Sequence, residues 1–346
     1  GFPLYVLFLG RTVRRPGWSN ALIAALALVF SCLVHVMHVV YFVLPITVAV
    51  LLIGLLEWKS AFFTWRRLGS LAILFGLAAL IASPFLLPAL SRSVQDDGYL
   101  YKVGTVDHSI DLLAFFTPSP YHPVLGPLGL LPAFAEKVFY DEETLYEGLA
   151  YPGVLAVGLA VWGLVRQRRR AWVWGVVALV AGVLSLGPLL KVGNELVLYQ
   201  VDAYRSHVVL PYALLKQVPL LRVGRTPGRL NEIVMFAVAI LASYGVAALV
   251  RWLDRRPRLL AGVLVAALIG IGFESVAIWP FPVSTTEIPP VVQRVAGEPG
   301  DGAMLYASMK SRWVNHRALY YQTVARRPIV GGEVHRAVPE ALPWSE

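Results

Sequence analysis

Long apolar runs alternate with short polar segments along most of the chain. The apolar runs cover residues 2–10, 20–36, 39–56, 70–90, 149–165, 172–190, 231–250 and 259–279. A helix needs about 20 apolar residues to cross the hydrocarbon core of a bilayer. The pattern therefore predicts an all-α polytopic membrane protein with about seven full transmembrane helices and a partial one at the start of the chain.

The overall composition supports a membrane protein. The chain is 57% hydrophobic and only 15% charged, whereas soluble domains average about 45–50% apolar and about 25% charged residues. The net charge is +9, but the basic residues fall in short bursts between apolar runs. A nucleic-acid-binding domain would be far less apolar, so we expect the bilayer and no nucleic acid as partner. Cys32 is the only cysteine, which excludes a disulfide framework or a thiolate metal site.

The charges of the connecting segments predict an orientation. Segments 11–17, 57–67, 166–170 and 251–258 together hold fourteen Lys and Arg against two acidic residues. The positive-inside rule places such segments in the cytoplasm. Loops 91–148 and 191–230 and the segment 280–346 then lie on the external face of the membrane. We expect the protein to work on that face, because most of its mass outside the bilayer is there.

The composition changes at about residue 280 and predicts two domains. Beyond it, "VVQRVAG" has a helical pattern, "GAMLYAS" resembles a strand, and "RALYYQTVARRPIV" predicts a short helix followed by an extended run. We predict a transmembrane module over 1–279 and the beginning of an external α/β domain over 280–346. The chain is apolar from Gly1 and ends within that domain, so we expect it to be a fragment of a longer protein.

One basic cluster breaks the orientation rule. The stretch "PYALLKQVPLLRVGRTPGRLNEIVMF" lies on the predicted external side and carries Arg222, Arg225 and Arg229. Their spacing of three and four places them on one face if the segment is helical. Guanidinium groups match phosphate oxygens, so the cluster predicts binding of a lipid phosphate at the interface. Pairing with nearby carboxylates, or extension into lipid headgroups, is the structural alternative.

Loop 91–148 carries the other candidate chemistry. Carboxylates and imidazoles can act as general acids or bases, and the candidates are Asp96, Asp97, Asp107, Asp111, His108 and His122. None has a metal-ligand spacing, so the residues predict no metal site. Ordinary loop polarity is the alternative for each. His35 and His38, three residues apart, either share a ligand or reach the interface.

Three stretches resemble one bacterial membrane family. They are "FFTPSPYHPVLG" followed by "YEGLAYPGVLAVGLAVWGL", the basic cluster that runs into "AVAILASYGVAAL", and "IPPVVQRVAGEPGDGAMLYAS" with "LYYQTVARRPIVGG". In order and context they resemble the GT-C glycosyltransferase superfamily, specifically its bacterial polytopic YfhO-like group. The histidine–glycine pair usual before the "RPI" element is replaced by "ARRPI", so no histidine role is carried over to that position.

The resemblance implies a cell-envelope glycosyltransferase that moves a hexosyl or pentosyl unit on the external face. The donor would be a polyprenyl-phosphate-linked sugar and the acceptor a glycan or protein. Arg222, Arg225 and Arg229 would hold the donor phosphate. The main catalytic carboxylate is expected before Gly1, and weaker candidates for the donor or acceptor groove are Asp96, Asp97, Asp107 and His108. A divalent metal ion stays open as a cofactor.

Two other functions stay open. One is a transporter or flippase for a lipid-linked substrate, and the other is a non-catalytic factor in polysaccharide or cell-envelope assembly. Transporters usually carry ionisable residues near the bilayer midplane and internal repeats. Here the apolar runs are nearly free of charge, with Glu274 the clear exception, and no repeat is visible. The sequence therefore favours the transferase over transport.

Overall fold

A computed structural model describes most of the chain in two units, residues 1–280 and 281–346. The described residues are 1–35, 37–95, 105–139, 148–202, 204–217, 225–277, 279, 287–300, 302–305 and 312–330. The first unit holds all of the long apolar helices, and the second unit combines helices with a small sheet.

The first unit is mostly helical. Its longer helices are α1 (Phe2–Arg14), α2 (Trp18–Val34), α3 (Leu44–Trp58), α4 (Trp65–Gln95), α7 (Val154–Arg166), α8 (Arg168–Ser185), α11 (Asn231–Trp252) and α12 (Pro257–Glu274). Shorter turns are η1 (Val39–Val43), η2 (Lys59–Phe62), η3 (Leu112–Phe116), α5 (Ala135–Val138), α9 (Tyr212–Leu215) and η4 (Pro227–Leu230). Each predicted apolar run coincides with one of the longer helices.

Within the part of the chain that the structure describes, four helical stretches are long and apolar enough to cross a membrane. They are Val39–Phe62, Trp65–Pro88, Pro227–Trp252 and Pro257–Glu274, while α2 and α7 are apolar but shorter. These helices agree with the predicted integral membrane protein, and the number of seven crossings stays a prediction. Helix α4 continues to Gln95, past the predicted end at residue 90, because its polar last turn has no helix breaker.

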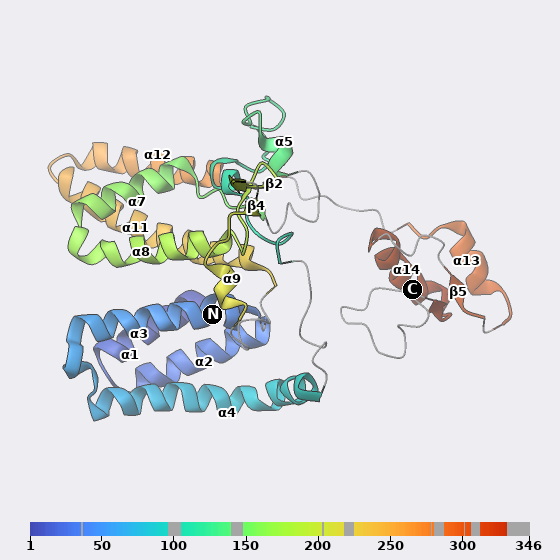
Figure 1. Cartoon of the computed structure of the whole chain (residues 1–346), viewed down its shortest axis with the longest axis horizontal. Coiled ribbons are helices and arrows are strands. Elements are labelled where there is room, and N and C mark those ends of the chain that lie inside the picture. Colours follow the sequence, from blue (N-terminus) through green and yellow to red (C-terminus); the bar gives the residue numbers. More distant parts are fainter. Residues whose placement is uncertain are drawn as a thin grey trace. The chain divides into compact units, whose positions relative to one another are not determined.

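The long helices form two bundles, α1–α4 and α7, α8, α11 and α12 (Figure 1). Helices α3 and α8 face each other across the seam between them (Figure 1). Aromatic contacts close part of this seam: the ring of Phe2 lies 5.1 Å from that of Phe236, which in turn lies 5.9 Å from Trp174.

Helices α7 and α11 approach each other closely through small residues. A Cβ on Gly163 would collide with the carbonyl oxygen of Leu241, and a Cβ on Gly245 would collide with that of Leu159. Small residues allow membrane helices to pack backbone against backbone. At the end of α7, Gln167 donates a hydrogen bond to the Tyr244 carbonyl over 2.9 Å.

Loop 191–230 contains two antiparallel hairpins that the sequence analysis did not predict. The pairs are β1 (Lys191–Val192) with β2 (Glu195–Leu196), and β3 (Leu198–Val201) with β4 (Tyr204–His207). Gly193 and Asn194 turn the first hairpin with φ of 61° and 66°, the left-handed backbone that a two-residue hairpin turn of type I′ requires. Strands of two to four residues are too short to show an alternating pattern.

The second unit has the predicted local elements. Helix α13 (Pro290–Gly297) covers "VVQRVAG", and α14 (Arg312–Ala325) covers the second helical pattern. Strands β5 (Met304–Leu305) and β6 (Ile329–Val330) pair in parallel. The elements agree with the local patterns of the sequence, and an external α/β domain over 280–346 stays a prediction.

Candidate lipid-phosphate site

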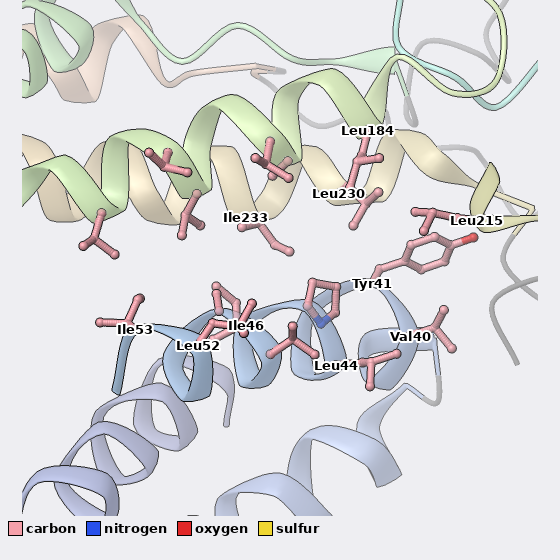
Figure 2. Close-up of a pocket in the computed structure, with 18 of the residues that line it drawn as sticks. Val40, Tyr41, Leu44, Ile46, Leu52, Ile53, Leu184, Leu215, Leu230 and Ile233 are labelled. Carbon is pink, nitrogen blue, oxygen red and sulfur yellow. The ribbon is translucent and has the colours of Figure 1, made fainter. Parts of the chain in front are cut away.

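An apolar groove of about 490 Å³ lies in the seam between the two bundles. Figure 2 shows Leu44, Ile46 and Leu52 on one wall, facing Leu184 and Ile233 on the other. Every described lining residue is aliphatic or aromatic. We call this cavity the apolar groove.

The apolar groove follows the length of a membrane helix. Its lining residues on η1 and α3 run from Val40 to Leu56, a rise of about 24 Å in helical geometry. The hydrocarbon core of a bilayer is about 30 Å thick. The groove therefore runs along most of the length of a helix that is long enough to cross a membrane.

Polar groups gather at the Tyr41 end of the apolar groove. Tyr41 belongs to the π-helical turn η1, and π-turns inside helices often mark functional sites. Its hydroxyl accepts a hydrogen bond from the Thr226 amide over 2.6 Å and is also hydrogen-bonded to the hydroxyl of Tyr212. Both tyrosines are almost fully buried. They join the first bundle to α9 and to residues 225–230, which we call the arginine segment.

Burial raises the pKa of the Tyr212 hydroxyl well above its usual range, and the neighbouring Tyr41 raises it further. Tyr212 therefore stays protonated at any physiological pH. A protonated phenol is a hydrogen-bond donor. At the polar end of the groove this donor is engaged by the hydroxyl of Tyr41 and is protected from solvent.

Two of the three predicted phosphate-binding arginines lie at this end. Arg229 is in η4, and the next residue, Leu230, lines the apolar groove. The Nη1 atom of Arg229 is 3.5 Å from Nε2 of His35. Arg225 immediately precedes Thr226 and is half-buried. Arg222 lies outside the described residues.

The helical arrangement of the arginines is only partly as predicted. The turn η4 is a 3-10 helix that begins at Pro227, and proline favours the first turn of a helix because it has no amide hydrogen to donate. Arg225 therefore precedes the turn that holds Arg229. The two arginines therefore do not share one continuous helical face.

Loop 105–111 packs against the arginine segment. The His108 carbonyl accepts a hydrogen bond from the Gly228 amide over 3.0 Å, and Lys216 donates to the Thr105 hydroxyl over 2.7 Å. Through this backbone contact both candidates lie close to η4. His108 is half-buried there, and Asp107 is exposed. Asp96 and Asp97 lie outside the described residues.

Asp111 has a structural role in the same loop. Its buried carboxylate accepts hydrogen bonds from the amides of Leu113, Gly193 and Asn194, over 2.9, 3.1 and 2.7 Å. It therefore caps η3 and holds the first hairpin turn. Burial lowers the pKa of the nearby Lys191, and the carboxylates of Asp111 and Asp107 oppose this shift.

His122 is engaged on both sides of its ring. Its Nε2 lies 2.9 Å from the Phe273 carbonyl, and its Nδ1 accepts hydrogen bonds from the amides of Val124 and Leu125. A carbonyl can only accept, so Nε2 carries the proton. The side chain is buried. These bonds assign His122 to folding of the proline-rich loop, and the described residues contain no group of three or more potential metal ligands.

Glu274, the charged exception in the apolar runs, caps another helix. Its carboxylate accepts hydrogen bonds from the amides of Val154 and Leu155 over 3.1 and 3.0 Å, and from the Tyr151 hydroxyl over 3.3 Å. These amides open α7, where a negative charge is favourable. Gly153 turns with φ of 85° beside the carboxylate. Tyr151 and Gly153 thus belong to a helix start whose cap comes from a remote helix.

No family model, no curated protein and no solved structure matches the chain. Its likeness to the GT-C superfamily therefore remains a proposal that depends on the site itself.

The sequence analysis missed the two buried tyrosines. Tyr41 lies in an apolar run, where an aromatic residue is usually part of the core. Tyr212 lies in the stretch that carries the basic cluster, where the arginines are the stronger signal. A signal was available for both: a buried tyrosine hydroxyl needs a polar partner, so a tyrosine in a membrane segment indicates a nearby polar site.

Proposed function

We propose that the protein is a GT-C-type membrane glycosyltransferase that takes a polyprenyl-phosphate-linked sugar. The observation that carries the proposal is the apolar groove, which ends at Tyr41 and Leu230, next to the segment that carries Arg225 and Arg229. An isoprenoid chain is apolar and extended, and its phosphate is anionic. One molecule therefore matches both the apolar walls and the cationic end of the groove.

The charged end suits the chemistry of transfer. An acceptor oxygen bonds to the anomeric carbon while the bond from that carbon to the phosphate oxygen breaks, and the lipid phosphate leaves with the electron pair. Charge grows on the phosphate in the transition state, so fixed guanidinium groups favour that state over the ground state. The acceptor proton passes to a carboxylate, for which Asp107 is the described candidate.

The proposal includes an orientation. The arginine-rich connections between helices, such as that of α7 with α8, lie in the cytoplasm by the positive-inside rule. The cluster at η4 then lies at the external interface, at the other end of α11. An external site is where a lipid-linked sugar meets acceptors of the cell envelope. The predicted seven crossings and the GT-C fold belong to this proposal.

Binding and transfer test the proposal separately. We expect purified protein to bind a polyprenyl phosphate more tightly than the matching polyprenol, and Arg225→Gln and Arg229→Gln to remove that preference. Transfer from a labelled polyprenyl-phosphate sugar should fall by about 10²–10³ in either variant, as for other lost transition-state donors.

Arg205→Gln is the matched control. Arg205 is an exposed arginine of β4 in the same loop, so its loss lowers the net charge equally without touching the groove. Full transfer by Arg225→Gln would refute the phosphate-binding role. Phosphate-dependent binding without transfer to any acceptor would favour the transporter or assembly-factor alternative.

A further inference from the structure

A second and larger cavity, of about 1150 Å³, opens at the opposite end of the seam. It lies among α1, α3, α8 and α11, and five arginines line it: Arg11, Arg14, Arg15, Arg169 and Arg170. Among the described lining residues, Glu57 is the one acidic side chain. We call this cavity the arginine cavity.

The five arginines converge from two helix ends. Three belong to the last turn of α1 and the residue after it, and two belong to the first turn of α8. All five are exposed. Like charges on two facing elements repel each other, and a bound anion relieves this repulsion. The guanidinium fork also matches the oxygens of a phosphate group.

The interior of the arginine cavity is apolar. Its walls include Pro3, Leu7 and Val50 on the first bundle, and Phe236 and Ile240 on α11. The twelve residues from Pro3 to Arg14 correspond to about 16 Å of helix. The cavity thus combines a cationic mouth with an apolar depth, as an amphiphile requires.

We propose that the arginine cavity binds an anionic phospholipid from the adjoining leaflet. The headgroup phosphate lies among the arginines, and an acyl chain enters the apolar walls. A free phosphate ion occupies only the mouth and leaves the apolar depth in contact with water, which is unfavourable. By the positive-inside rule this end faces the cytoplasm, where the leaflet is rich in anionic lipid. The inference is independent of the transferase proposal.

Lipid binding to the purified full chain in neutral detergent tests this inference. We expect phosphatidylglycerol to bind more tightly than phosphatidylcholine, with retained anionic lipid visible in native mass spectra. The double variant Arg14→Gln with Arg169→Gln should weaken phosphatidylglycerol binding at least about tenfold, because hydrogen bonds to charged groups are among the strongest in proteins.

A control double variant removes two positive charges at the same end of the helices. Arg168 and Arg258 are exposed and do not line the cavity, so the double variant Arg168→Gln with Arg258→Gln should bind normally. Equal losses in both double variants would show unspecific attraction and overturn the inference. Far-UV circular dichroism and thermal unfolding confirm that each variant is folded.

A further variant distinguishes a lipid from a soluble anion. Leu7 lines the cavity and is 49% exposed, so Leu7→Trp fills the apolar depth at little cost to the packing. We expect this variant to lose phosphatidylglycerol binding and to keep whatever weak affinity the mouth has for inorganic phosphate. Unchanged lipid binding, or displacement of the lipid by millimolar inorganic phosphate, would overturn the inference.

Discussion

The hydroxyl of Tyr41 accepts a hydrogen bond from the backbone amide of Thr226 over 2.6 Å, across the seam between the two helix bundles. The two residues are 185 positions apart in the chain. Both are buried, so neither can exchange this bond for water. The bond therefore fixes the arginine segment against the end of the apolar groove.

Tyr41→Phe should uncouple that segment. The substitution keeps the ring but leaves the buried Thr226 amide without its acceptor, which typically costs about 1–3 kcal/mol. We expect a lower free energy of unfolding and weaker binding of polyprenyl phosphate. Tyr121→Phe is the control, because Tyr121 is 46% exposed. Equal stability of the two variants would contradict a structural role for the Tyr41 hydroxyl.

Gly163→Ala should separate α7 from α11. The added methyl group meets the backbone of Leu241 and Gly245, which cannot move aside as a side chain can. Overpacking of this kind costs about 1–3 kcal/mol. Gly158→Ala is an internal reference on the same helix, because a Cβ there has no neighbour within 4 Å. Thermal unfolding should show Gly163→Ala below the wild type and Gly158→Ala equal to it or above it.

Glu274→Ala should weaken the start of α7. The amides of Val154 and Leu155 lose their acceptor, and loss of a helix N-cap costs about 0.5–2 kcal/mol. Hydrogen exchange of these two amides should accelerate, while exchange in the middle of α11 stays unchanged. Glu136→Ala, which removes an exposed acid, provides the comparison. A uniform change throughout the chain would indicate general destabilisation instead of a lost cap.

The burial of Lys191 predicts that the free energy of unfolding depends on pH. Burial lowers its pKa from the ordinary value of 10.5, so between the lowered value and 10.5 the unfolded chain binds more protons than the folded protein. The contribution of Lys191 to the free energy of unfolding therefore rises with pH across this window. We expect Lys191→Met to be at least as stable as the wild type at neutral pH. Its advantage should disappear near the upper end of the window, and an advantage that grows with pH would contradict this assignment.

The helices were predictable because apolar runs must be helical to cross a bilayer. Every backbone amide inside the hydrocarbon must be hydrogen-bonded within its own helix. This requirement predicts both the type and the approximate limits of α3, α4, α11 and α12. The two short hairpins were not predictable from such a rule. Their strands are held by turns and by the carboxylate of Asp111, which precedes the first of them by eighty residues.

The candidate site was predictable only in its charges. The arginines stood out because they belong to a segment that is predicted to be external, where the positive-inside rule disfavours basic residues. The apolar groove did not stand out, because it forms where helices that are far apart in the chain face each other. For the same reason the role of Glu274 was hidden: its partners are backbone amides, which leave no trace in the side-chain pattern.

Helix α12 contains no buried residue. Among the described residues, its polar ties to other elements come from its last turn, through Glu274 to the start of α7 and through Phe273 to His122. Along most of its length the apolar surface of α12 is therefore left for the surrounding lipid and not for the other helices. The hydrocarbon, more than packing within the protein, holds this helix in place.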